Sequence, residues 1–178
     1  MRNQQDSSCR THAFCLPAHV LLACALSLAA CGPDVQDPPP ERAQRQVKLA
    51  EDHLARKSWD DATREVELAE KIAPQSFTVK MAVGRVYAER GWTERAIYKY
   101  REAGELNPDK GTASTEIGRC LIAMGRYDEA LTELNEAIDQ NVALAEPHFL
   151  RGFALIYLTR NIEASKEFQE CLKKDPNR

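Results

Sequence analysis

The sequence predicts an all-α fold, an α-solenoid of four tandem helix–turn–helix units. The first observation is a 34-residue period that runs without a gap over residues 43–76, 77–110, 111–144 and 145–178. The second is that small, apolar and helix-ending residues recur at fixed places in each unit. Because a unit of this length cannot bury its own apolar face, neighbouring units must stack to form a continuous core.

Five positions of the repeat explain why each unit forms two packed helices. Small residues hold the eighth, twentieth and twenty-seventh positions, where the helices approach closely, and an apolar residue at the twenty-fourth position inserts between them. Proline at the thirty-second position ends the second helix, because the residue before a proline is pushed out of the α region. In that order, the columns read Ala50, Gly84, Gly118 and Gly152; Ala62, Ala96, Ala130 and Ala164; Val66, Tyr100, Leu134 and Phe168; Ala69, Ala103, Ala137 and Cys171; and Pro74, Pro108, Val142 and Pro176.

The turn between the two helices has its own signals. Gly91 and Gly125 hold the fifteenth position, where a left-handed residue that ends a helix is most easily formed by glycine. The acidic pairs Asp60-Asp61 and Asp128-Glu129 follow this position, and negative charge favours a helix N-terminus. We therefore expect one helix before the fifteenth position of each unit and a second helix after it.

These columns resemble the tetratricopeptide repeat over residues 43–178, most completely in the strings RGWTERAIYKYREAGELNPD and MGRYDEALTELNEAIDQN. The chain departs from the family where Val142 replaces proline, and at the fourth position, where the family usually has tryptophan. That position reads Gln46, Lys80, Ser114 and His148. The resemblance implies a right-handed superhelix whose first helices line a concave groove for a protein or peptide partner.

The resemblance also assigns residues to this groove, at the second, fifth, ninth, twelfth and thirteenth positions of each repeat. The residues that we expect to bind a peptide are Met81, Arg85, Thr115, Arg119, Phe149, Phe153 and Tyr157. The two arginines share the ninth position in adjacent repeats, so we expect them side by side, and the i, i+4, i+8 spacing of the aromatic residues predicts one stripe. Such a groove suits a peptide with acidic and apolar residues. Two alternatives stay open: the arginines form only a solvated face, and the aromatic residues only pack between the helices of the last repeat.

Residues 1–30 are interpreted as a lipoprotein signal peptide. An apolar run over 13–30 follows Arg2 and Arg10, is short for a membrane span, and ends in Leu-Ala-Ala before Cys31. This ending resembles the lipobox of bacterial lipoproteins, which implies cleavage before Cys31 and acyl chains that anchor the protein in a membrane. A simple secretory signal and an uncleaved anchor are the alternatives. Residues 31–42, with three consecutive prolines, are predicted to be an extended tether.

Composition and motifs argue against several classes of function. The formal net charge is −3 and no block of Lys or Arg occurs, so we expect no nucleic-acid partner. The sequence contains no HExxH, no GxSxG and no phosphate-binding glycine loop, and His53 and His148 have no partner at ligand spacing. We therefore predict no enzyme activity, no catalytic residue, no metal site and no cofactor. Cys120 and Cys171 are predicted to be buried free thiols rather than a disulfide.

Taken together, the sequence predicts a non-catalytic interaction scaffold, lipid-anchored in the bacterial envelope. Gly32 after Cys31 resembles the signals for the inner leaflet of the outer membrane, facing the periplasm. A lipoprotein signal before such repeats is similar to the pilotins of type IV pili, which implies a role in assembling or localising an envelope complex such as a secretin.

Other interpretations remain open at this point. They are a regulatory or adaptor subunit of a periplasmic enzyme, and a secreted or cytoplasmic adaptor without a lipid anchor. Polar residues such as Arg151 at the seventh position predict a polar outer end for the fourth repeat. Self-association through this C-terminal repeat would cover the remaining apolar surface of the repeat.

Overall fold

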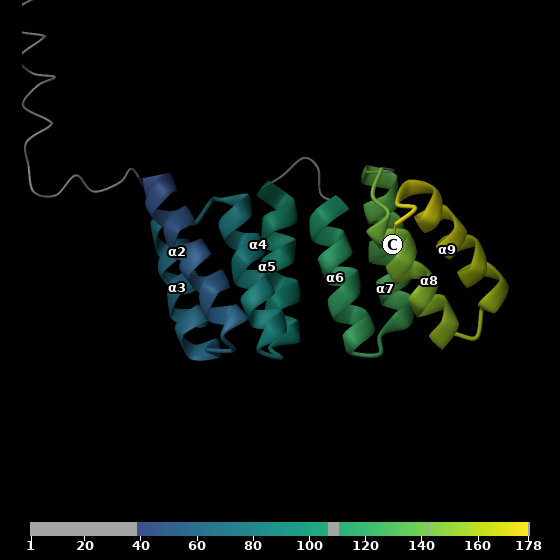
Figure 1. Cartoon of the computed structure of the whole chain (residues 1–178), viewed down its shortest axis with the longest axis horizontal. Coiled ribbons are helices and arrows are strands. Elements are labelled where there is room, and N and C mark those ends of the chain that lie inside the picture. The colour runs from purple at the N-terminus through teal and green to yellow at the C-terminus, as the bar shows by residue number, and fades with distance from the viewer. Residues whose placement is uncertain (1–38, 107–110, 142, 178) are drawn as a thin grey trace, which may run out of the picture. The chain divides into compact units, whose positions relative to one another are not determined.

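A computed structural model of the chain describes residues 39–106, 111–141 and 143–177, and in this part of the chain every regular element is an α-helix (Figure 1). The predicted signal peptide, Cys31 and the first part of the tether lie outside the described residues. Two helices fall in each predicted repeat, which confirms the all-α solenoid. They are α2 (Pro39–Ala55), α3 (Trp59–Ile72), α4 (Phe77–Glu89), α5 (Thr93–Leu106), α6 (Gly111–Ala123), α7 (Tyr127–Gln140), α8 (Glu146–Tyr157) and α9 (Asn161–Lys174).

The start of α2 differs from the prediction. Residues 39–42, which we assigned to the end of the tether, form the first turn of this helix. Proline is tolerated there, because the amides of the first helical turn have no intrahelical partner and the fixed φ of proline suits a helix. The prolines at positions 39 and 40 therefore begin the repeat domain, whereas the sequence pattern alone favoured an extended conformation.

The close approach of the two helices in each repeat is confirmed at the glycines of the eighth position. A Cβ atom built on Gly84 would lie 2.6 Å from the ring of Tyr100, and one on Gly118 would lie 2.7 Å from Leu134. The first repeat has Ala50 at this position, together with the smaller Val66. The eighth and twenty-fourth positions are thus complementary in size: where the residue at the eighth position is larger, the one inserted against it is smaller.

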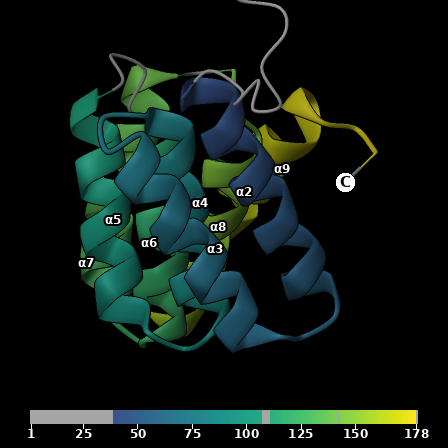
Figure 2. The same cartoon turned by 90° about the vertical axis from the view of Figure 1, so that its left-hand side faces the viewer.

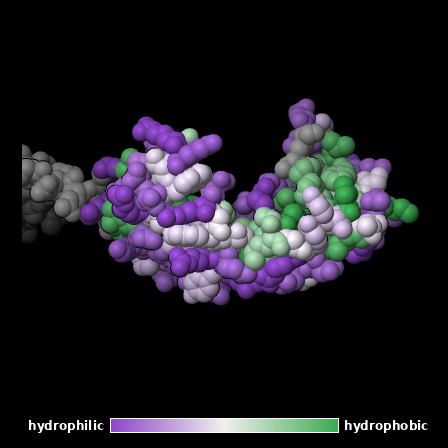
Figure 3. All heavy atoms as spheres, turned by 90° about the horizontal axis from the view of Figure 1, so that it is seen from below, coloured by the Kyte–Doolittle hydropathy of each residue, from purple (hydrophilic) through white to green (hydrophobic). Residues whose placement is uncertain are grey.

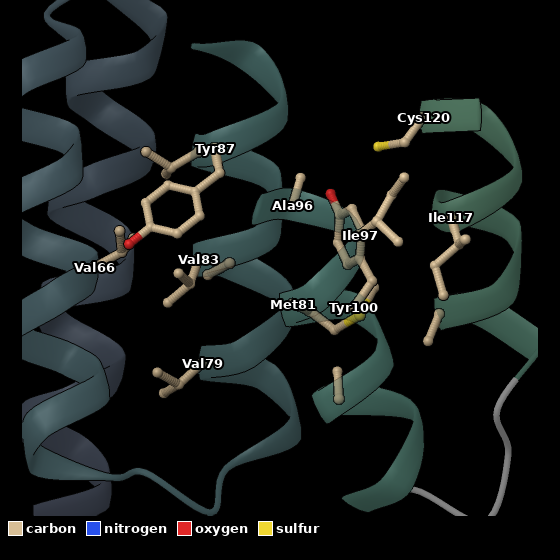
Figure 4. Packing of buried hydrophobic residues seen from close by; sticks show 14 of the residues in the cluster. Val66, Val79, Met81, Val83, Tyr87, Ala96, Ile97, Tyr100, Ile117 and Cys120 are labelled. Atoms are coloured by element: carbon tan, nitrogen blue, oxygen red, sulfur yellow. The ribbon is translucent and has the colours of Figure 1, made fainter. Parts of the chain in front are cut away.

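The second repeat buries two opposite faces, one against the first repeat and one against the third. Figure 4 shows Val83 of α4 pointing toward Val66 of α3, while Met81 and Tyr100 lie on the other side, facing Ile117 of α6. The resulting hydrophobic core is one cluster that runs from the first repeat into α8. This confirms that the repeats stack to bury a core that no single unit could form.

The turn inside each repeat has the same backbone geometry in all four units. Its fifteenth residue has a positive φ in every unit: Lys57 (58°), Gly91 (85°), Gly125 (74°) and Thr159 (61°). In the second repeat, for example, the amide of Trp92 donates to the carbonyl of Tyr87 (2.8 Å) and the amide of Gly91 to that of Ala88 (2.9 Å). These are the two hydrogen bonds of the Schellman motif. The left-handed turn predicted at Gly91 and Gly125 is confirmed, and it also occurs at two positions without glycine.

Thr159→Gly is expected to raise the free energy of unfolding by about 1 kcal/mol, because a β-branched residue is strained in the left-handed region and glycine is not. Urea denaturation followed by circular dichroism measures the change. Gly125→Thr is the matched control, and it should lower stability by a similar amount. A loss of stability in Thr159→Gly would contradict the expectation.

Candidate functional site

The first helices of the repeats lie along one face of the repeat domain. There α2 contacts α4 and α6 contacts α8, and the view along the stack in Figure 2 shows the second helices α5 and α7 on the opposite side from α2. Figure 3 shows a hollow between the α2 end and the α8–α9 end, with hydrophobic atoms concentrated toward the C-terminal end. The site residues predicted from the sequence all lie on α4, α6 and α8.

The two arginines predicted for the groove are exposed, but each pairs with glutamates of the chain. Arg85 donates to Glu51, one repeat earlier, at 3.3 Å. Arg119 donates to Glu116 at 3.1 Å and pairs with Glu146, one repeat later. A ligand carboxylate would have to compete with these glutamates. Exposed ion pairs of this kind contribute little to stability.

Both arginines also act on one buried hydroxyl. Burial, and then the charge of Glu116, raise the pKa of Tyr100 above its ordinary value, while the charges of Arg85 and Arg119 both oppose this rise. That the two arginines lie side by side stays a prediction.

Three aromatic residues and one isoleucine of α8 are partly exposed, and we call these four residues the α8 row. The exposed fractions are 37% for Phe149, 39% for Phe153, 45% for Ile156 and 55% for Tyr157. The rings of Phe153 and Tyr157 lie 5.2 Å apart, and Tyr157 stacks on Tyr127 of α7 at 4.8 Å. The row is thus held by ring contacts on one side and is open to solvent on the other.

Two of the predicted groove residues are buried. Met81 is 9% exposed and belongs to the hydrophobic core. Thr115 is 4% exposed, and its hydroxyl donates to the carbonyl of Gly111 at 2.6 Å. Both hold the fifth position of a repeat that is followed by another repeat. The accessible part of the predicted groove is therefore formed by the two arginines and by the aromatic residues of the α8 row.

The fourth position, which the sequence marked only by its missing tryptophan, carries a polar network in the second repeat. Lys80 donates to Glu70 of α3 (2.6 Å) and Glu102 of α5 (2.8 Å), and Lys99 donates to the same two carboxylates at 2.7 and 2.9 Å. Burial alone would raise the pKa of Glu70, but hydrogen bonds from both lysines outweigh it and hold that pKa below its ordinary value. The four charges join three helices of two repeats.

The fourth repeat has a second polar cluster at the same position. His148 is 7% exposed and its Nδ1 lies 2.9 Å from a carboxylate oxygen of Glu167, which also pairs with Arg151. Arg151 donates as well to Asn135 of α7, at 2.7 Å. Arg151 therefore lies at the junction with the third repeat, which corrects the prediction that it forms a polar outer end. The seventh position faces the preceding repeat, so its polarity says nothing about the outer end.

Other kinds of site were sought in the same residues. Within residues 39–106, 111–141 and 143–177, no three His, Cys, Asp or Glu side chains are grouped so that they could hold a metal ion. No helix in this part of the chain is long and apolar enough to cross a membrane. Cys120 and Cys171 are buried free thiols, as predicted, and burial raises the pKa of Cys120 to about 11.

Comparison with known proteins agrees with the fold. A family model described as tetratricopeptide repeat matches residues 87–148. Superkiller complex protein 3 of Mus musculus is 25% identical over 107 residues, which are 56% of this chain and 7% of that protein. The chain thus spans a small part of that relative's length.

Solved structures with the same fold include three proteins known as PilF, MamA and YrrB. PilF of Pseudomonas aeruginosa has a TM-score of 0.71 and 21% identity, over 80% of this chain and 65% of that chain. MamA has a TM-score of 0.66 and 20% identity, over 77% of this chain and 80% of that chain. YrrB, described as a TPR protein with an unusual peptide-binding site, has a TM-score of 0.63 and 19% identity, over 76% of this chain and 70% of that chain.

At these identities the structural likeness shows the fold alone. The family match runs from the end of α4 through α5, α6 and α7 to the start of α8, and the same period and helix pairs continue on both sides of that segment. The glycine contacts and the turn geometry repeat from unit to unit in the same register. Residues 87–148 are therefore similar to the tetratricopeptide repeat, and the helix pairs on both sides of them share its period.

Proposed function

We propose that this chain is a non-catalytic interaction scaffold that binds a segment of a partner protein on the face formed by its first helices, with the α8 row as the main contact. The observation that carries the proposal is the exposure of four neighbouring large apolar residues on one helix. Soluble proteins rarely expose a large contiguous apolar patch, and those that occur mark interaction sites. Aromatic residues are also enriched among those that dominate binding energy.

We expect the aromatic residues to contribute more to ligand binding than the two arginines. Glu51 and Glu146 already balance the charges of Arg85 and Arg119, so a ligand gains little from placing a carboxylate there. The α8 row, by contrast, releases water from apolar surface when a ligand covers it. The favoured ligand is a segment with large apolar side chains, and its acidic residues add selectivity. YrrB, which has the same fold, is described as having a peptide-binding site, and this supports a peptide as the ligand.

A membrane anchor at Cys31 would place this scaffold in the bacterial envelope, where it would assist the assembly or localisation of an envelope complex. The proposal for the anchor depends on the sequence, where Cys31 follows an apolar run and two alanines. Metabolic labelling with a fatty-acid probe tests it. Label on the wild type and none on Cys31→Ala would support the anchor, and equal labelling of both would contradict it.

The double substitution Phe153→Ala and Tyr157→Ala is expected to weaken partner binding at least about tenfold, as is typical of aromatic residues that dominate an interface. A photoreactive amino acid at position 153 first identifies the partner in the native envelope. The dissociation constant of a labelled peptide from the crosslinked region is then measured for each variant by fluorescence anisotropy.

Tyr98→Ala is the matched control, since Tyr98 is an aromatic residue of α5 that is 61% exposed. Its affinity for the peptide should equal that of the wild type. Thermal unfolding must show that the double variant keeps its helices. Unchanged binding by a folded double variant would mean that the α8 row only packs within the last repeat, and the proposed binding face would then be wrong.

A further inference from the structure

The three internal junctions of the repeat domain follow one packing rule. The residues at the fifth and twenty-fourth positions of a repeat are covered by the first helix of the next repeat, as Met81 and Tyr100 are by α6 (Figure 4). The covering helix uses the third, seventh and tenth positions of its repeat. At the first two junctions these are apolar: Val79, Val83 and Val86 in α4, each at most 1% exposed, and Ala113, Ile117 and Cys120 in α6. At the third junction they are Pro147, Arg151 and Ala154, and Arg151 donates a hydrogen bond to Asn135 of α7. The first two junctions thus accept an apolar i, i+4, i+7 pattern.

The corresponding face of the fourth repeat has no such cover in the described residues. Phe149 at the fifth position is 37% exposed, against 9% for Met81, and Leu172 of α9 is 50% exposed. These two residues, with Phe168 and Cys171, line a cavity of ≈ 180 Å³. We call the surface of Phe149, Ile162, Phe168 and Leu172 the terminal face.

Ile162 distinguishes this face from an ordinary repeat junction. It holds the eighteenth position, where the other three repeats have an acid that attracts an arginine of the next repeat. Arg90 pairs with Asp60 at 2.6 Å and Arg126 with Glu94 at 3.1 Å. Arg160 pairs with Glu163 of its own repeat at 2.8 Å, and the charge of Asp128 adds a smaller attraction. Ile162 is 78% exposed, the most exposed large apolar side chain among the described residues. The fourth repeat therefore has an apolar side chain at the position where the other three repeats have an acid.

We propose that the terminal face docks an amphipathic helix of a partner protein, one with apolar residues at i, i+4, i+7 and i+11. The first three would occupy the places that Val79, Val83 and Val86 take at the first junction. The fourth corresponds to Arg90 and would lie against Ile162. The helix would run antiparallel to α9, because the first helix of each repeat packs that way on the preceding second helix: Lys80, near its start, bonds Glu70, near the end of α3.

A second copy of the chain fits this face poorly in a head-to-tail stack. The third, seventh and tenth positions of the first repeat, on α2, are Arg45, Leu49 and Asp52. Docking α2 of another copy would bring two charged side chains against the apolar terminal face, which is costly. The helix that fits must come from a partner with an uncharged stripe.

A pair of synthetic helices tests the proposal with the full-length chain. The first probe is a hydrocarbon-stapled, fluorescein-labelled peptide of residues 77–90, FTVKMAVGRVYAER. The second carries Arg90→Leu, which completes the apolar stripe. We expect the Arg90→Leu peptide to bind at least about tenfold more tightly, as measured by fluorescence anisotropy, because one buried apolar side chain is worth about this factor.

Two variants of the chain make the test specific. Ile162→Asp restores the acid of the other repeats and should reverse the preference, so that the peptide with Arg90 binds more tightly. Leu172→Glu should abolish the binding of both peptides, and its exposed position makes loss of folding easy to exclude by thermal unfolding. No saturable binding by the wild type, or no effect of either variant, would overturn the proposal.

Two further measurements distinguish this proposal from binding at the α8 row and from self-association. If Phe153→Ala with Tyr157→Ala abolishes probe binding and Leu172→Glu does not, the probe lies on the α8 row, and the terminal-face proposal fails while the proposed function stands. Analytical ultracentrifugation of the wild type should show a monomer. A dimer that Leu172→Glu dissociates would show that a second copy covers the face, and this outcome would also overturn the proposal.

Discussion

Lys80→Met is expected to lower the free energy of unfolding by about 3 kcal/mol, because it leaves Glu70 and Glu102 sharing one lysine in a partly buried site. The side chains of the four charged residues are 11–27% exposed, so water replaces the lost hydrogen bonds poorly. Urea denaturation measures the change. Arg85→Met is the control: it also breaks an ion pair, but both partners there are more than half exposed, and we expect a loss of less than about 1 kcal/mol.

The double variant Lys80→Met with Glu102→Leu should recover much of the lost stability, because Lys99 and Glu70 then form a balanced pair. A double variant that is less stable than Lys80→Met alone would show that the network acts through packing and not through charge balance.

The same network predicts a pH dependence in both directions. Hydrogen bonds from the lysines hold the pKa of Glu70 and Glu102 below 4.5 against the effect of burial, so their contribution to stability is present above pH 4.5 and lost as pH falls through the lower folded values. Hydrogen bonds from these glutamates raise the pKa of Lys80 and Lys99 above 10.5, again against burial. The contribution of the lysines is complete below pH 10.5 and is lost as pH rises through the folded values.

The stability difference between the wild type and Lys80→Met should therefore be largest between pH 4.5 and pH 10.5 and should shrink on both sides. Urea midpoints measured across this range give the profile. A difference that does not change with pH would contradict the electrostatic role of the network.

Gly84→Ala is expected to destabilise the protein by about 2 kcal/mol, although alanine is the better helix former by about 1 kcal/mol. The added Cβ would lie 2.6 Å from the ring of Tyr100, which is 2% exposed and surrounded by core residues. The ring cannot move away without disturbing the junction with the third repeat. Gly104→Ala is the control, because its Cβ would meet only Ala113, at 3.6 Å, and should leave stability within about 1 kcal/mol of the wild type.

A second substitution should rescue this variant. Gly84→Ala with Tyr100→Val reproduces the Ala50 and Val66 pair of the first repeat, so the two changes should be far less costly together than the sum of each alone. The coupling free energy from a double-mutant cycle is expected to be about 2 kcal/mol. Additive effects would show that the eighth and twenty-fourth positions do not constrain one another.

The candidate site was predictable in part. The repeat period locates the first helices, and the i, i+4, i+8 spacing on α8 predicted a row of three aromatic residues. All three are partly exposed, and the rings of Phe153 and Tyr157 are in contact. The groove positions implied by the family resemblance also included Met81 and Thr115, which the next repeat buries. Position within a repeat does not fix exposure, because the exposure of the fifth residue depends on whether another helix covers it.

The polar clusters show a similar limit. Lys80 and His148 share the fourth position, and the sequence showed only that neither is the expected tryptophan. Their partners Glu70 and Glu167 lie on other helices, and in the first case in another repeat. Nothing local in the chain pairs these residues, so the stacking of helices decided which charges meet.

The sequence by itself determined the helix pairs, their turns and their close contacts, because these depend on residues within one 34-residue period: a glycine against a large side chain, a left-handed residue after a helix, and an apolar stripe along one face. Only the tertiary structure decided which predicted groove residues reach solvent, how Arg85 and Arg119 are neutralised, and that Ile162 and Leu172 lie exposed at one end. The physical reason is that exposure and charge pairing are properties of the stack. They arise where one repeat meets the next, or where no described repeat follows.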